Sequence, residues 1–279
     1  MSRIEFSHQS SALGYRTTFT ALIPSIDWIE MMRGVTADAF EGKRFPVLWL
    51  LHGSSGDNDC WTRFTRIESW AEQYGIAVIM PDARLSAYSD MDRGPAYYSY
   101  ITEELPALCR SMFPLLEGRA NNFIGGLSMG GYGALKIGLR LPERYSLILN
   151  LSGGVDRVAH VRRTLGENRM TGLHNVRAMQ ATFGDLSRIE GGIHDVFALA
   201  ETLARSGAPK PKIFTSIGTQ DPHWDENVRL RNALIRNDYD LTWEQGPFIH
   251  DWTSWNHYIE LALGWAAAQW EKKGDAIGW

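Results

Sequence analysis

The segment 122–140 constrains the fold of this chain more than any other. It reads NFIGGLSMGGYGALKIGLR, so a short apolar run leads into a G-x-S-x-G pentapeptide centred on Ser128 and then into a helical pattern. Glycines on both sides of a serine remove the Cβ atoms that would clash in a tight turn. The segment therefore predicts a strand, a sharp turn and a helix, with the serine hydroxyl projecting from the turn as a nucleophile.

The rest of the chain alternates apolar runs of strand length with longer helical patterns. Several runs are apolar throughout, which is typical of strands whose two faces are both covered by helices. The alternation predicts an α/β fold with a mostly parallel central sheet flanked by helices. The predicted strands are 16–23, 45–51, 76–80, 122–126, 147–151, 212–217 and 241–244, and the predicted helices are 60–74, 99–113, 130–140, 193–206, 225–237 and 253–271.

Composition excludes several other classes of protein. Of 279 residues, 44% are hydrophobic and 22% are charged, which is ordinary for a globular protein and argues against disorder. The net charge of -4 argues against binding to nucleic acid or to an anionic membrane. No stretch reaches roughly 18 apolar residues, and the N-terminal residues lack the apolar core of a signal peptide, so we expect a cytoplasmic protein.

The interval 153–192 breaks the alternation of strands and helices. It is polar, rich in arginine and irregular. We therefore expect a small cap or lid inserted into a single domain that spans residues 1–279. Its basic run 157–163 (RVAHVRR) is interpreted as an exposed face of the cap, and the alternative is a surface that attracts an acidic substrate or a partner subunit.

A base and an acid are expected after the serine, because this architecture places them in the chain order serine, acid, histidine. Of the eight histidines, His250 and His257 follow the last predicted strand. His250 lies in a loop that can reach Ser128, whereas His257 lies inside the final helical pattern. Asp221 follows the strand 212–217, and Asp225 is better explained as a helix N-cap. We predict that His250 is the general base and that Asp221 orients it.

An oxyanion-stabilising loop is predicted where the strand 45–51 runs into His52, Gly53 and Ser54. The backbone N–H groups of Ser54 and Met129 are the expected donors. His52 is interpreted as a structural residue that forms hydrogen bonds within this loop.

Four further side chains are predicted to contact substrate at the rim: Trp61, Arg84, Tyr88 and Trp252. For the tryptophans the alternative is simple packing, and for the other two it is a solvated loop. Cys60 is expected to be a buried, inert thiol, and one disulfide with Cys109 stays open. His223 lies near Asp221, but no metal-binding spacing accompanies it, so no metal is predicted.

With these residues assembled, the chain resembles the esterase D-like branch of the α/β-hydrolases, and within it the tributyrin esterase type. That group has feruloyl and acetyl esterase relatives and is related to the S-formylglutathione hydrolases. The resemblance rests on LLHGSSGDNDCW (50–61), VIMPDARLSAY (78–88), TEELP (102–106), GGLSMGGYGALK (125–136), IGTQD (217–221) and HDWTSWNHYI (250–259).

The resemblance implies an α/β-hydrolase fold, a triad on Ser128, Asp221 and His250, and oxyanion amides at Ser54 and Met129. It also implies no cofactor and frequent assembly into homo-oligomers. S-formylglutathione hydrolases usually carry a histidine before the nucleophile, where this chain has Leu127.

The chain is therefore expected to be a serine carboxylesterase that hydrolyses small-molecule esters with short acyl chains. The alternatives are a sugar- or aryl-ester deacylase of the acetyl xylan or feruloyl esterase kind, an acyltransferase, and a non-catalytic binding protein on a hydrolase scaffold.

Overall fold

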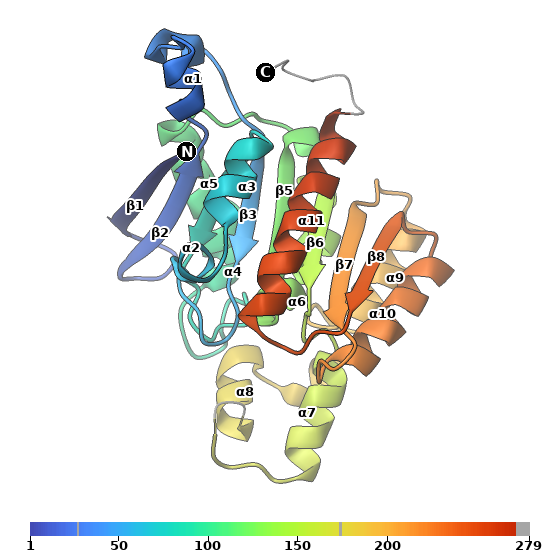
Figure 1. Cartoon of the computed structure of the whole chain (residues 1–279). Coiled ribbons are helices and arrows are strands. Elements are labelled where there is room, and N and C mark those ends of the chain that lie inside the picture. Colours follow the sequence, from blue (N-terminus) through green and yellow to red (C-terminus); the bar gives the residue numbers. More distant parts are fainter. Residues whose placement is uncertain (27, 173–174, 272–279) are drawn as a thin grey trace.

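A single eight-stranded sheet organises the computed structural model, which describes residues 1–26, 28–172 and 175–271 (Figure 1). The strand order is β1-β2-β4-β3-β5-β6-β7-β8. Neighbours from β4 to β8 pair in parallel, whereas β1 and β2 form an antiparallel hairpin whose second strand pairs antiparallel with β4. The strands are β1 Ser2–Gln9, β2 Arg16–Ile23, β3 Val47–Leu51, β4 Ala77–Pro81, β5 Asn122–Leu127, β6 Leu147–Leu151, β7 Lys212–Gly218 and β8 Leu241–Gly246.

The predicted mostly parallel α/β sheet is confirmed, and each of the seven predicted strands is present within two residues of its expected bounds. The strand β1 was not predicted from the sequence. It is an edge strand with one face toward solvent, and its eight residues carry apolar side chains only at Ile4 and Phe6. Pairing with β2, rather than a strong apolar pattern, makes this segment a strand.

Helices cover both faces of the sheet, as continuous apolar strands require. In β3, Val47, Trp49 and Leu51 pack into the layer that contains α5, α6 and α9, whereas Leu48 and Leu50 pack into the layer that contains α3 and α11. The helices are α1 Trp28–Met32, α2 Cys60–Phe64, α3 Ile67–Gln73, α4 Tyr97–Ser99, α5 Leu105–Met112, α6 Met129–Arg140, α7 Arg157–Gly166, α8 Val176–Phe183, α9 Val196–Ser206, α10 Trp224–Arg236 and α11 Trp252–Glu271.

Two predicted helices are less regular than expected. The helix predicted over 60–74 is split into α2 and α3, because Thr65 adopts an extended conformation between them. The helix predicted over 99–113 begins earlier, at α4, and passes through a π-helical turn, Tyr100–Glu104, before α5. Among the described residues, no helix combines the length and the apolarity needed to cross a membrane.

The described residues of the segment 153–192, called the insertion segment from here on, contain α7 and α8 and lie beyond the carboxyl ends of the parallel strands (Figure 1). Asp156 caps α7 by accepting a hydrogen bond from the Ala159 N–H. The segment has a small apolar cluster of its own, made by Val161, Met179, Leu186 and Ile189. Its position brings α7 close to the end of β5, where Ser128 lies.

Candidate active site

Ser128 occupies the sharp turn between β5 and α6, in a backbone conformation that few non-glycine residues adopt (φ 53°). A Cβ atom at Gly126 would lie 2.6 Å from the Leu51 carbonyl oxygen, and one at Gly130 would lie 2.3 Å from the same oxygen. Both distances are far below contact, so the turn exists only with glycine at these two positions. The predicted strand, turn and helix are confirmed.

The structure brings Ser128, Asp221 and His250 together from three separate loops. Asp221 follows β7, and His250 lies between β8 and α11. The Asp221 Oδ2 atom lies 2.7 Å from His250 Nδ1, and His250 Nε2 lies 3.0 Å from Ser128 Oγ. When Nδ1–H donates to Asp221, Nε2 carries the lone pair that can accept the serine proton.

Neighbouring groups hold the side chains of Asp221 and His250 in place. The Asp221 side chain is fully buried, and its second oxygen accepts a hydrogen bond of 2.8 Å from the His223 N–H. The His250 ring meets Trp255 edge-on at 4.9 Å between centroids and meets the His223 ring at 5.0 Å. The imidazole is thus held on two sides by rings and at Nδ1 by a carboxylate.

Ser54 and Met129 line the same cavity as Ser128. Met129 is the first residue of α6, where backbone N–H groups have no partner within the helix. In the described part of the chain, no hydrogen bond occupies the backbone N–H of either residue. Both amides are therefore available to a ligand oxygen near Ser128.

His52 supports the loop that carries Ser54. Its Nδ1 lies 2.6 Å from the Gly53 oxygen, and its Nε2 accepts a hydrogen bond of 2.9 Å from the Ala83 N–H. Burial lowers the pKa of His52, which favours the neutral ring that this pair of contacts requires. His52 is thus a structural residue, as the sequence indicated.

Two of the four predicted substrate contacts are wrong. Tyr88 is fully buried, and its hydroxyl donates to the His52 carbonyl oxygen at 2.7 Å. Trp61 is also fully buried, and its indole N–H donates to the Leu51 carbonyl oxygen at 3.3 Å. Both side chains have polar partners inside the protein and pack beneath the site, so neither presents a surface to substrate.

The other two predicted contacts stay predictions. The Arg84 side chain is 71% exposed and forms an ion pair of 3.0 Å with Asp82. Trp252 is partly buried and packs edge-on against Trp61 and Trp255. Neither Arg84 nor Trp252 lines the cavity at Ser128.

The two cysteines are free and buried, so they form no disulfide. Burial raises the pKa of the Cys60 thiol to about 12. The reactive thiolate is therefore disfavoured, in agreement with the predicted inert thiol.

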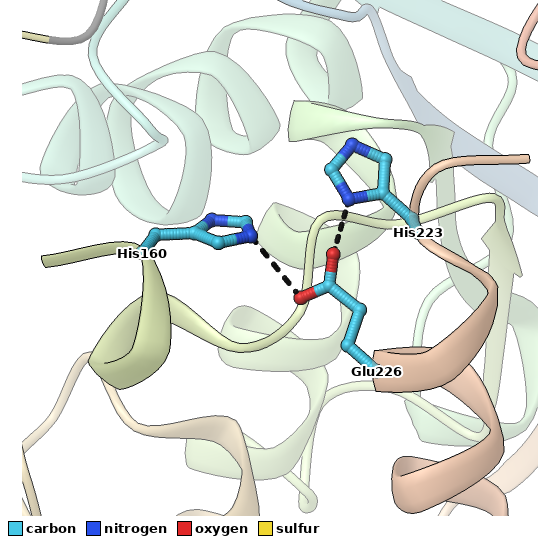
Figure 2. A group of neighbouring side chains, drawn as sticks. All are labelled: His160, His223 and Glu226. Atoms are coloured by element: carbon cyan, nitrogen blue, oxygen red, sulfur yellow. Dashed lines mark hydrogen bonds and ion pairs between the residues drawn. The ribbon is translucent and has the colours of Figure 1, made fainter. Parts of the chain in front are cut away.

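A cluster that the sequence did not reveal lies beside His250: His160, His223 and Glu226 (Figure 2). Glu226 is buried, and its carboxylate contacts His223 Nδ1 and, at 3.4 Å, His160 Nε2. Burial alone would raise the pKa of Glu226, but the hydrogen bonds from the two histidines outweigh it and hold this pKa far below its usual value. Glu226 is thus an ionised bridge between the insertion segment and the loop that carries Asp221.

The same three side chains are a donor set that a metal ion such as zinc accepts. Their ligand atoms lie within 4.8 Å of one another. No spacing in the sequence marks this group, because His160 lies in α7, whereas His223 is the N-cap of α10 and Glu226 lies in its first turn. The prediction that no metal is bound is not tested by this arrangement.

A cavity of about 160 Å³ opens at Ser128, and α7 supplies much of its lining. The interpretation of the run 157–163 as an exposed face is wrong for Arg157 and His160, which are partly buried and line this cavity, whereas Arg163 lines it but is exposed. Their spacing of three residues places them on one side of a helix. This three-residue spacing could have shown from the sequence that the three side chains share a helix face, but the residues around it show no regular pattern.

Comparison with known sequences identifies the family of this chain. The family model named Esterase matches residues 37–265. An acetyl esterase of Caldicellulosiruptor saccharolyticus is 30% identical over 266 residues, which cover 95% of this chain and 98% of the relative. An S-formylglutathione hydrolase of Paracoccus denitrificans is 35% identical over 163 residues, which cover 50% of this chain and 53% of the relative.

Solved structures agree in fold. The fluorophosphonate-binding serine hydrolase F of Staphylococcus aureus superimposes with a TM-score of 0.81 at 30% identity, covering 95% of this chain and 98% of that one. A ferulic acid esterase superimposes with a TM-score of 0.75 at 18% identity, covering 96% and 97% of the two chains. The second similarity shows a common α/β-hydrolase fold.

Proposed function

Because the chain belongs to the Esterase family and is a serine ester hydrolase, we propose that it hydrolyses short-chain carboxylic esters through an acyl-enzyme on Ser128. The observation that carries this proposal is the hydrogen-bonded series from Asp221 through His250 to the Ser128 hydroxyl, at 2.7 and 3.0 Å. No other serine among the described residues has a histidine ring nitrogen as a hydrogen-bond partner.

In the first half of the reaction, Ser128 Oγ attacks the ester carbonyl carbon while its proton moves to His250 Nε2. The carbonyl oxygen becomes an oxyanion and accepts hydrogen bonds from the N–H groups of Ser54 and Met129. Asp221 stabilises the imidazolium that forms. The C–O bond to the alcohol then breaks, and His250 returns the proton to the leaving oxygen.

In the second half, water replaces the alcohol. His250 takes a proton from the water as its oxygen attacks the acyl carbon, and the second oxyanion occupies the same two amides. The bond to Ser128 Oγ then breaks, the serine regains its proton from His250, and the carboxylic acid is released.

The size of the cavity at Ser128 supports a short acyl chain. A cavity of about 160 Å³ has room for a small group rather than a long chain. The acetyl esterase relative, which matches nearly the whole chain, supports the same size.

Hydrolysis of 4-nitrophenyl acetate, butyrate and octanoate by wild type and Ser128→Ala tests the proposal. We expect kcat to fall by about 10³-fold or more in the variant, and octanoate to be the poorest substrate. Ser111→Ala, at an exposed serine of α5, is the matched control and should retain wild-type rates. Equal, slow hydrolysis by wild type and Ser128→Ala would show that the serine has no catalytic role, and faster cleavage of octanoate than of butyrate would refute the short-chain assignment.

A further inference from the structure

The cavity at Ser128 carries an excess of positive charge. Arg157, Arg163 and Arg169 line it together with His160 and His223, and no Asp or Glu is among the described residues that line it. The buried carboxylate of Glu226 already bridges the two histidines. A cavity of this kind offers cations to a ligand that reaches the nucleophile.

Two of these arginines have no carboxylate of their own. Arg169 forms an ion pair with Glu167. Among the described residues, neither Arg157 nor Arg163 has an ion-pair partner within 4.0 Å. Neither guanidinium group thus has a carboxylate in direct contact, although the charge of Glu226 acts on Arg157 from a greater distance.

Arg157 is the more constrained of the two. Its guanidinium lies over the Tyr132 ring at 4.3 Å, and its Nε atom is buried without a hydrogen-bond partner. Burial lowers the pKa of Arg157, although an arginine stays charged at neutral pH. A buried cation with an unused donor is costly unless an anion compensates it.

Arg162 lies on the same helix, α7, but on a different side from these residues. Arg157, His160 and Arg163 recur every third residue and line the cavity, whereas Arg162 forms an ion pair with Glu190 and does not line it. Adjacent positions on one helix thus give a cavity arginine and a surface arginine.

On the basis of the proposed esterase function, we propose that the substrate carries a carboxylate or similar oxyanion group, which Arg157 and Arg163 bind while Ser128 attacks the ester carbonyl. Arginine suits this task because its planar fork of N–H donors matches the two oxygens of a carboxylate. The anionic group can belong to the acyl chain or to the alcohol, and both sources present the same chemistry to the arginines.

Pairs of esters that differ only in charge show whether the anionic group belongs to the acyl chain or to the alcohol. For the acyl side, mono(4-nitrophenyl) adipate is compared with its terminal carboxamide analogue. For the alcohol side, 4-acetoxybenzoate is compared with 4-acetoxybenzamide. The measured quantity is the ratio of kcat/KM for the carboxylate ester to that for the amide ester, in wild type, Arg163→Gln and Arg162→Gln.

We expect the ratio to exceed about tenfold in wild type for one of the two pairs, which identifies the anionic side. Arg163→Gln should lower that ratio by about tenfold, whereas Arg162→Gln should change it by less than twofold. Arg163 is exposed and forms no ion pair with described residues, so its replacement should leave the fold intact. Thermal unfolding of both variants checks this.

The proposal is overturned if wild type prefers the amide esters or shows no preference in either pair. It is also overturned if Arg162→Gln lowers the ratio as much as Arg163→Gln, because the effect then reflects overall charge rather than a site. Failure of the esterase function itself looks different, since wild type would cleave neither the amide esters nor the carboxylate esters and a fluorophosphonate would not label Ser128.

Discussion

The turn that carries Ser128 and the insertion segment line one cavity, but they are built in different ways. The turn is packed backbone against backbone, so a single methyl group at Gly130 would lie 2.3 Å from the Leu51 oxygen. The insertion segment has a small apolar cluster and presents exposed, charged side chains around it. The difference indicates that reactive geometry is fixed by the sheet, whereas the charge that selects a substrate can vary on α7 without disturbing it.

The largest loss of activity is expected from Asp221→Asn. One Asp221 oxygen accepts from the His250 ring and the other from the His223 N–H, so both of its partners are donors. Asparagine has one oxygen and can satisfy only one of them. If the oxygen faces His223, the amide group faces His250 and favours the tautomer in which Nε2 carries the proton and cannot accept one. We expect kcat to fall by about 10⁴-fold with a similar KM.

Asp225→Asn is the matched control for this change. Asp225 is exposed and lies in the first turn of α10 rather than at the N-cap, which is His223, so the sequence-based N-cap assignment is wrong. Steady-state kinetics on 4-nitrophenyl butyrate should show wild-type rates for this variant. A loss of less than tenfold in Asp221→Asn would mean that the sheet-edge geometry does not set the rate.

Replacing one glycine by alanine in each region tests the difference in packing directly. Gly130→Ala places a methyl group against backbone oxygens that cannot move independently, and it should lower the free energy of unfolding by about 3 kcal/mol or more. Gly166→Ala, at the end of α7, meets no atom within 4 Å and should raise that free energy by up to about 1 kcal/mol. Urea unfolding measures both, and equal effects would contradict the proposed contrast.

The sheet and the grouping of Ser128, Asp221 and His250 could be predicted from the sequence for a shared reason. Parallel strands buried on both faces leave continuous apolar runs, and their carboxyl ends meet at one edge. A residue that directly follows such a run is therefore placed by the strand before it. Asp221 follows β7, Ser128 follows β5, and both positions were found in this way.

The side chains around the site were harder to predict, because their positions depend on contacts between distant segments. Tyr88 and Trp61 follow strands as Ser128 does, but their hydroxyl and indole groups point to backbone oxygens in the interior. The bridge from His160 to Glu226 joins residues 66 positions apart, and no local pattern marks it.

The smallest effect on stability concerns the junction between the two regions, where His194 lies two residues after the end of the insertion segment. Its ring packs against Phe183 of α8 at 4.8 Å, and its carbonyl oxygen accepts a hydrogen bond from the Tyr132 hydroxyl of α6 at 3.1 Å. Burial, together with the positive charges of Lys136, Arg140 and Arg157, lowers the pKa of His194 from 6.5 to about 3. The folded protein therefore holds this ring neutral at pH values where the unfolded chain protonates it.

The contribution of His194 to the free energy of unfolding is therefore fully present above pH 6.5. It is lost as the pH falls toward about 3, because in that range the unfolded state binds a proton that the folded state does not. At pH 5 the loss should reach about 2 kcal/mol at most. We expect His194→Phe to remove this part of the pH dependence, so that the difference in unfolding free energy between pH 7 and pH 5 shrinks relative to wild type. An unchanged difference would mean that the junction does not respond to acid through His194.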